Sequence, residues 1–270
     1  MEKININDID FSTLQKSKNQ GTKSILYENG DFCIKILNSL YDKEKKELYR
    51  KFLEMDGISI NGVILPKTLI VLNDKLEGYI MDNFKNSTNL IDYFGCNRYV
   101  NCKDIFKAVK KTSLILKSIH ENGIICQDLS FDNILIDING NIKYCDIDGC
   151  TYKDFTSPFL SLLLKRFLFD YRKENDCCIS KNMDRISLML SFYLIVYTNE
   201  IQKISKKKYD MLSNNIVTLE NMKKYAKALV NKKISLHEIP YLDELIDDND
   251  DYIIDREKQL SLTQKILRKF

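Results

Sequence analysis

Few histidines, no long apolar run and no excess of one charge limit what this chain can be. It has two histidines, His120 and His237, and its eight cysteines form no C-x-x-C pair, so a zinc site has little support. The longest apolar stretch, residues 186–197, is too short to span a bilayer. The 41 basic residues against 38 acidic ones give a net charge of +3, which makes no electrostatic case for nucleic-acid binding.

The chain is long enough for one medium-sized enzyme. Its 270 residues, 44% of them hydrophobic, can bury a substantial core, in one two-lobed domain or two small ones. The first eight residues contain no apolar secretory core. Cys33, Cys126 and Cys145 lie in apolar segments, where free thiols behave as small hydrophobes, so a reduced protein is the simplest account. We therefore expect a soluble, cytoplasmic protein that binds neither membrane nor nucleic acid, and the oligomeric state stays open.

The strongest chemical signal lies around a predicted hairpin. Residues 134–136 and 142–144 are predicted as short strands, and the turn around Gly140 supplies the residues that tolerate positive φ. Asn133 precedes one strand and Asp146 follows the other, so the hairpin brings both side chains to the same end. Two such oxygen ligands can hold Mg²⁺, which needs only one or two protein ligands besides phosphate oxygens.

Asp128 lies on the loop that leads into this hairpin. A carboxylate there can orient and deprotonate an attacking hydroxyl. A calcium-binding loop beginning at Asp137 is the alternative, but that pattern needs Gly at its sixth position and Glu at its twelfth, where Ile142 and Asp148 stand. Any one of these Asp or Asn residues alone would more often be a turn or capping residue, so the assignment depends on the rest of the chain.

The order and spacing of these residues resemble the protein-kinase catalytic loop, H-R-D-x-x-x-x-N, followed by D-F-G. Asp128 matches the catalytic Asp, Asn133 the metal-binding Asn five residues on, and Asp146 the Asp of D-F-G. The resemblance implies that Asp128 is catalytic and that Asn133 and Asp146 bind Mg²⁺.

This sequence departs from the family pattern in both motifs. Cys126 and Gln127 replace the His and Arg, Ser130 replaces a Lys that is common there, and Asp148 is inserted before the Gly. The resulting D-x-D-G form is similar to bacterial and small-molecule members of the kinase-like superfamily. Without the Arg, we do not expect activation by a phosphorylated loop that pairs with this position.

The N-terminal third is predicted to form a small sheet with one helix. Apolar and alternating stretches predict strands, and an Asn-Gly turn separates the first two. A segment with helical period and propensity follows them. The predicted strands cover residues 24–27, 32–37, 62–72 and 76–81, and the predicted helix covers residues 41–55.

Lys35 interrupts an apolar strand, where an outward-facing residue is the simpler interpretation. Beside the motif, it resembles the strand lysine that contacts the α- and β-phosphates of ATP in kinases. Gly21 lies where the family's glycine-rich loop covers the phosphates, in a segment with one glycine instead of three. In kinases a helix glutamate holds that lysine. Glu44 is our first candidate and Glu47 the second, and for both an exposed lysine partner along the helix is the competing interpretation.

Residues 81–84 close the last of these strands and resemble the kinase hinge. The resemblance implies that main-chain groups of Asp82 and Phe84 hold the adenine of ATP, with Met81 at the back of the pocket.

The rest of the chain is predicted to be helical. Residues 102–120 follow the 3.6-residue period, and His120 near the end of this helix is interpreted as structural. In the apolar helix predicted over 183–197, Asp184 resembles the early Asp of the kinase large lobe, which hydrogen-bonds the catalytic-loop backbone. Further amphipathic helices are predicted over residues 220–231 and 256–270.

The resemblance implies an α+β, two-lobed protein-kinase-like fold in a single domain. Residues 1–84 would form a small antiparallel sheet lobe with one helix, and residues 85–270 a larger, mainly helical lobe. ATP and Mg²⁺ are the expected cofactors. A divergent bacterial-type protein kinase acting on Ser or Thr hydroxyls is our first expectation. A kinase for a small hydroxyl-bearing acceptor, of the aminoglycoside or choline type, and a pseudokinase that serves as a binding module are the alternatives.

Overall fold

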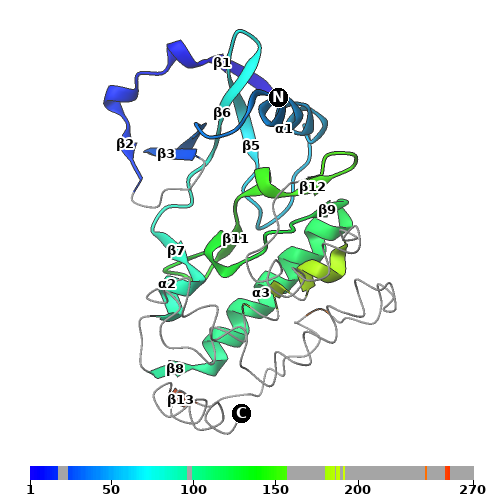
Figure 1. Cartoon of the computed structure of the whole chain (residues 1–270). Coiled ribbons are helices and arrows are strands. Elements are labelled where there is room, and N and C mark those ends of the chain that lie inside the picture. Colours follow the sequence, from blue (N-terminus) through cyan, green and yellow to red (C-terminus); the bar gives the residue numbers. More distant parts are fainter. Residues whose placement is uncertain are drawn as a thin grey trace, which may run out of the picture.

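The computed structural model of the chain describes residues 1–17, 24–95, 99–156, 180–185, 187, 188, 191, 241 and 253–255. Their arrangement is drawn in Figure 1. Gly21 and the helices expected over 220–231 and 256–270 lie outside the described residues, as does most of the helix expected over 183–197. Residues 181–185, at the start of that last helix, are helical.

A six-stranded sheet in the order β1-β5-β6-β4-β3-β2 dominates the N-terminal part (Figure 1). Its hairpins form where residues of positive φ allow tight turns, at Gly30 between β3 and β4 and at Asn73 and Asp74 between β5 and β6. All neighbours pair antiparallel except β1, which runs parallel to β5. The strands are β1 (Glu2–Asn5), β2 (Gln15–Lys16), β3 (Ser24–Asn29), β4 (Phe32–Leu37), β5 (Pro66–Leu72) and β6 (Lys75–Asp82).

One helix, α1 (Asp42–Glu54), packs against this sheet. Its buried residues include Leu48 and Phe52, and the Phe52 ring meets Tyr79 of β6 edge-on with 5.1 Å between the ring centroids. The short 3₁₀ turns η1 (Ile6–Asp8) and η2 (Phe11–Thr13) connect β1 to β2.

The remaining described elements surround one long helix, α3 (Cys102–Glu121), as predicted for residues 102–120. The predicted hairpin forms as β10 (Ile134–Asp137) and β11 (Ile142–Tyr144), and β7 adds a third strand beside β10. The other elements are β7 (Ser87–Asn89), α2 (Leu90–Gly95), β8 (Tyr99–Asn101), β9 (Ile124–Ile125), η3 (Phe131–Asn133), η4 (Ile147–Gly149), β12 (Thr151–Tyr152) and β13 (Ile253–Asp255). β12 pairs with β9, and β13 pairs with β8.

The loop after α1 joins the sheet to the hairpin. The amide of Ile64 donates to the Tyr144 carbonyl at 2.9 Å, and the amide of Tyr144 donates to the Gly62 carbonyl at 2.7 Å. Gly62 has φ +79°, and a Cβ there would lie 2.6 Å from Ile115 of α3, so only glycine fits. Apolar residues of β4, α1, α3 and β11 also pack together in one hydrophobic core.

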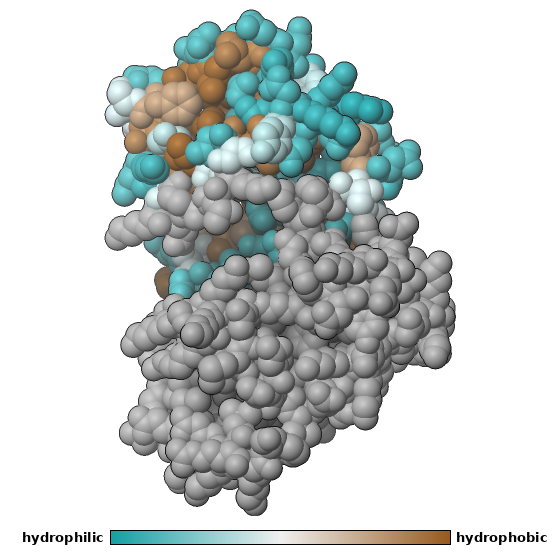
Figure 2. Space-filling model, in the orientation of Figure 1, coloured by the Kyte–Doolittle hydropathy of each residue, from teal (hydrophilic) through white to brown (hydrophobic). Residues whose placement is uncertain are grey.

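The described residues thus form an α+β structure with a multi-strand sheet and few helices. Figure 2 shows apolar and hydrophilic side chains adjoining one another over the sheet-containing part of the face that it draws. Within the described ranges, no helix has the length and apolar character needed to cross a membrane.

Candidate functional site

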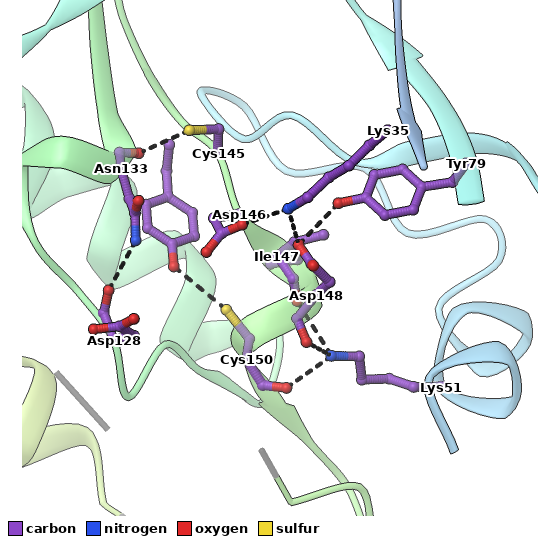
Figure 3. Close-up of polar contacts among 11 residues, drawn as sticks. Lys35, Lys51, Tyr79, Asp128, Asn133, Cys145, Asp146, Ile147, Asp148 and Cys150 are labelled. Carbon is purple, nitrogen blue, oxygen red and sulfur yellow. Dashed lines mark hydrogen bonds and ion pairs between the residues drawn. The ribbon is translucent and has the colours of Figure 1, made fainter. Parts of the chain in front are cut away.

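Lys35 lies at the centre of a partly buried group of charges. It comes from β4, where it pairs with Tyr79 of β6, and its ammonium reaches the segment that follows β11 (Figure 3). Lys35 Nζ donates to Asp146 Oδ1 at 2.6 Å and to Asp148 Oδ1 at 2.8 Å. The Tyr79 hydroxyl donates to the same oxygen of Asp148 at 2.8 Å. The fold therefore brings together Lys35 and Asp146, two residues that the sequence places 111 positions apart.

The two carboxylates differ in how readily they ionise. Burial and the neighbouring Asp148 raise the pKa of Asp146 to about 6, against the pull of Lys35. Burial also opposes ionisation of Asp148, but Lys35 and Tyr79 outweigh it and lower the pKa of Asp148 to about 2. Desolvation of Lys35 opposes its charge, yet Asp148, Tyr79 and Asp146 raise its pKa well above the usual value. At neutral pH the Lys35 ammonium is therefore a cation shared by two carboxylates, those of Asp146 and Asp148.

Glu44 does not pair with Lys35, which corrects the expectation from sequence. Its carboxylate accepts a hydrogen bond from the main-chain N–H of Tyr41 at 2.8 Å, at the start of α1. A glutamate three residues after the N-cap satisfies an N–H that the helix leaves unbonded, and this local bond holds the side chain away from the sheet. Glu47, the second candidate, is exposed. The carboxylate that contacts Lys35 in addition to Asp146 belongs to Asp148, which the sequence analysis noted only as a departure from the family pattern.

The inward-facing charged residue of α1 is Lys51. It is 3% exposed, and its ammonium donates to the carbonyls of Ile147, Asp148 and Cys150. Lys51 lies three residues after Leu48 and four before Met55, both of which are buried. That spacing places it on the apolar face of the helix, which sequence reasoning missed because it considered the lysines of this helix only as exposed partners of Glu44 and Glu47.

The loop that leads to Asp128 is held by Asp184. The Asp184 carboxylate accepts from the main-chain N–H of Cys126 at 2.7 Å and of Gln127 at 2.8 Å, and from His120 Nε2 at 3.0 Å. Gln127 has φ +57°, a conformation that a non-glycine residue adopts only when its surroundings enforce it. These are the bonds that the resemblance implies for Asp184.

The Gln127 side chain connects this loop to β12, the strand that follows Asp146 and Asp148. Its Nε2 donates to the hydroxyl of Thr151 in β12, and Thr151 is paired with Ile125 of β9. The position that holds Arg in the family pattern is therefore occupied by a neutral side chain that makes an internal hydrogen bond.

Asn133 and Asp146 are the residues available to hold a divalent cation. The Asn133 amide nitrogen donates to the Asp128 carbonyl at 3.0 Å, so its side-chain oxygen is the atom left to act as a ligand. The main-chain N–H of Cys145 donates to the Asn133 carbonyl at 2.9 Å, which connects the two sides of the hairpin next to Asp146. Oxygen ligands suit Mg²⁺. Among the described residues no cluster of three or more His, Cys, Asp or Glu side chains has the geometry of a metal site. A pair of oxygen ligands suits a cation that completes its shell with phosphate oxygens and water, as Mg²⁺ does.

Asp146 itself has φ +73°. Asp tolerates the left-handed region better than most residues, because its short polar side chain can bond locally. This backbone conformation turns the chain from β11 into η4, so that Asp146 and Asp148 both face Lys35 (Figure 3).

The predicted hinge residues lie at the end of β6. Met81 pairs with Cys33 and Asp82 with Phe32, and the strand ends there. The Phe84 carbonyl accepts a hydrogen bond from the Ser87 hydroxyl, and the Lys143 ammonium lies 5.1 Å from the centre of the Phe84 ring. Adenine recognition by this segment stays a prediction, as does the ATP-binding role of Lys35. Gly21 lies outside the described residues.

No protein-family model matches the chain. Over 112 residues it is 27% identical to the probable serine/threonine-protein kinase MARK-C of Dictyostelium discoideum, which is 40% of this chain and 14% of that protein. Over 91 residues it is 30% identical to the probable serine/threonine-protein kinase MRK1 homolog of Encephalitozoon cuniculi, 32% of this chain and 29% of the relative. A serine/threonine-protein kinase of Candida albicans, CST20, is 29% identical over 126 residues, 44% of this chain and 9% of that protein.

The matched stretches therefore span less than a third of each of these relatives. Several partial similarities to serine/threonine protein kinases support a protein-kinase-like relationship. The narrower expectation of a bacterial-type kinase finds no support among them.

Proposed function

We propose that the chain is an ATP-dependent phosphotransferase that moves the γ-phosphoryl group of ATP to a Ser or Thr hydroxyl of a protein substrate. The observation that carries the proposal is the contact between Lys35 of β4 and Asp146, 2.6 Å apart, beside a loop that presents Asp128 and Asn133. The proposal includes the two-lobed arrangement, with residues 1–84 and 85–270 on either side of a hinge.

Each residue has a separate task in the proposed reaction. Lys35 contacts the α- and β-phosphates, and Asn133 and Asp146 hold Mg²⁺. When bound, Mg²⁺ neutralises the charge that develops on the phosphate oxygens. Asp128 orients the acceptor hydroxyl and takes its proton as the oxygen attacks the γ-phosphorus, while the bond from the γ-phosphorus to the β-phosphate oxygen breaks and ADP leaves. Asp184 contributes by holding the loop backbone, so most of the catalysis is positioning.

The acceptor is the least constrained part of the proposal. Protein substrates are supported by the names of the three relatives described above, each of which contains the words serine/threonine-protein kinase. The second candidate is a small hydroxyl-bearing acceptor. Two features favour it. Asp148, which contacts Lys35, creates the D-x-D-G form that is similar to small-molecule kinases. Gln127 stands where protein kinases have the Arg that pairs with a phosphorylated loop, and it bonds to Thr151 instead.

The test uses purified chain with γ-labelled ATP and Mg²⁺, and follows transfer to itself, to basic and acidic protein acceptors, and to a panel containing aminoglycosides and choline. Transfer to protein Ser or Thr supports the first candidate, and transfer confined to a small molecule supports the second. A chain that transfers nothing, and whose thermal unfolding does not respond to Mg²⁺-ATP, contradicts the proposed function and leaves a binding module.

A further inference from the structure

Asp148 is bound from two sides, and the proposed reaction assigns it no task. Its side chain accepts hydrogen bonds from Lys35 and from the Tyr79 hydroxyl. Its main-chain carbonyl accepts from Lys51 Nζ at 2.7 Å. One residue of the turn η4 is therefore attached to β4 and β6 through its carboxylate and to α1 through its backbone (Figure 3).

Lys51 is fully committed to this turn. Its three carbonyl partners, on Ile147 at 3.2 Å, Asp148 at 2.7 Å and Cys150 at 2.9 Å, equal in number the three N–H donors of an ammonium group. A buried ammonium is costly unless its donors are satisfied. The apolar face of α1 can therefore keep Lys51 only while the turn stays in contact with the helix.

The charges around Lys35 explain why a lysine suits this position of α1. Asp146 and Asp148 already place two carboxylates on one ammonium. A glutamate facing them from α1 would add a third anion, whereas Lys51 makes the group two cations and two anions. If Asp146 is engaged by a metal ion, Asp148 still holds Lys35 in place.

We propose that Asp148 and Lys51 together replace the helix glutamate of ordinary protein kinases. Asp148 is the positioning residue that holds Lys35, and Lys51 attaches α1 to residues 147–150. The inference rests on the proposed function, since it is the phosphates of ATP that Lys35 is positioned to contact.

The first test needs no nucleotide. In the full chain labelled with [¹⁵N]lysine, the ammonium signals of Lys35 and Lys51 are expected to be visible, because bonded and buried N–H groups exchange slowly with water. Replacement of either lysine by Arg assigns its signal. Asp148→Asn is expected to remove the Lys35 signal, and Glu44→Gln to leave it. A Lys35 signal that survives Asp148→Asn overturns the proposal.

The second test measures the attachment of α1. Lys51→Met is expected to speed amide hydrogen exchange in residues 147–150. Lys45→Met is the matched control, because Lys45 lies on the same helix and pairs with Glu77 at 2.6 Å, away from the turn. Equal exchange in the two variants overturns the role given to Lys51.

Nucleotide binding adds a third measurement. The dissociation constant for Mg²⁺-ATP is expected to rise about tenfold in Asp148→Asn and about threefold in Lys51→Met, with Glu44→Gln and Lys45→Met within about twofold of the wild type. If the wild type does not bind Mg²⁺-ATP, the proposed function fails, while the ammonium signals and amide exchange still decide this inference.

Discussion

The two sides of the candidate site are held in place by different interactions. The loop before Asp128 is fixed by main-chain N–H groups that donate to one buried carboxylate, Asp184. The turn that carries Asp146 and Asp148 is fixed by two lysines, one on its carboxylates and one on its carbonyls. We call these the loop side and the charged side.

The difference predicts how each side responds to change. The loop side depends on donors that become unsatisfied and buried when their acceptor is lost, which is costly at any ionic strength. The charged side depends on which carboxylates are ionised, so it responds to pH and to neutral substitutions of the same shape. Substitutions on the two sides can therefore affect the rate of phosphoryl transfer, the free energy of unfolding and the pH dependence of stability separately.

The largest effect is expected for the chemistry of the loop side. Asp128→Asn should lower the rate of phosphoryl transfer by about a thousandfold, because the amide cannot accept the hydroxyl proton. The affinity for Mg²⁺-ATP should change little, since Lys35 and Asp146 are untouched. Labelled-ATP transfer and calorimetric binding measure the two effects.

Asp132→Asn is the control for this substitution, because Asp132 lies in the adjacent turn η3 and is exposed. It should transfer phosphate at a rate near that of the wild type. Equal rates in Asp128→Asn and the wild type would contradict the assignment of Asp128.

Much of the local structure was predictable because it follows from local signals. The Asn-Gly turn and its apolar flanks predicted β3 and β4, and the 3.6-residue period predicted α3 to within one residue at its end. The parallel strand β1 was not predicted. Its pairing with β5 joins residues far apart in the sequence, and no turn between them marks the register.

The site was predictable where a spacing motif fixed it and not where side chains from distant elements meet. Asp128, Asn133 and Asp146 were chosen from their spacing and its resemblance to the kinase pattern, and their roles stay predictions. The partner of Lys35 could not, because helical period allowed Glu44 on the correct face while the local bond to Tyr41 decided its position. Lys51 was missed because a lysine on a helix is usually exposed.

Loss of the buried acceptor on the loop side is expected to be the largest effect on stability. Asp184→Ala would leave the N–H groups of Cys126 and Gln127 without their acceptor and would remove the hydrogen bond from His120 Nε2. The free energy of unfolding should fall by about 3 kcal/mol. Denaturant unfolding measures it, with the exposed Asp154→Ala as the control, and equal midpoints would contradict the role of Asp184.

A substitution at Gly78 can test the charged side without altering a charge, because it changes only the contact between two strands. A methyl group at Gly78 of β6 would overlap the carbonyl oxygen of Lys35 on the neighbouring strand. Gly78→Ala should therefore displace β4 and lower the free energy of unfolding by about 2 kcal/mol, and it should weaken Mg²⁺-ATP binding through Lys35.

Gly140→Ala separates this effect from the general cost of replacing glycine. Among the described residues, no atom other than those of Gly140 and its chain neighbours lies within 4 Å of a Cβ at this position, although its φ of +73° imposes its own strain. It should lower the free energy of unfolding by about 1 kcal/mol and leave nucleotide affinity unchanged. Unaltered affinity in Gly78→Ala would indicate that the position of Lys35 does not depend on this strand contact.

The smallest effect concerns pH. The folded protein raises the pKa of Asp146 to about 6 from an ordinary value of 3.8, so the folded state binds the proton more tightly than the unfolded state does. Ionised Asp146 therefore lowers stability as pH rises from about 4 to about 6, and Asp146→Asn should stabilise the protein at neutral pH. Because 35% of its side chain is exposed, solvent screening limits the gain to about 1 kcal/mol. The gain should disappear below pH 4, where the carboxyl is protonated in both states.

Asp148→Asn should lower the free energy of unfolding at neutral pH, the opposite of the effect of Asp146→Asn. The reason is that Lys35 lowers the pKa of Asp148 to about 2, so its ionised form stabilises the fold. Denaturant unfolding of both variants at pH 4 and pH 7.5 tests this, and a loss of stability in both at pH 7.5 would contradict the difference between the two carboxylates.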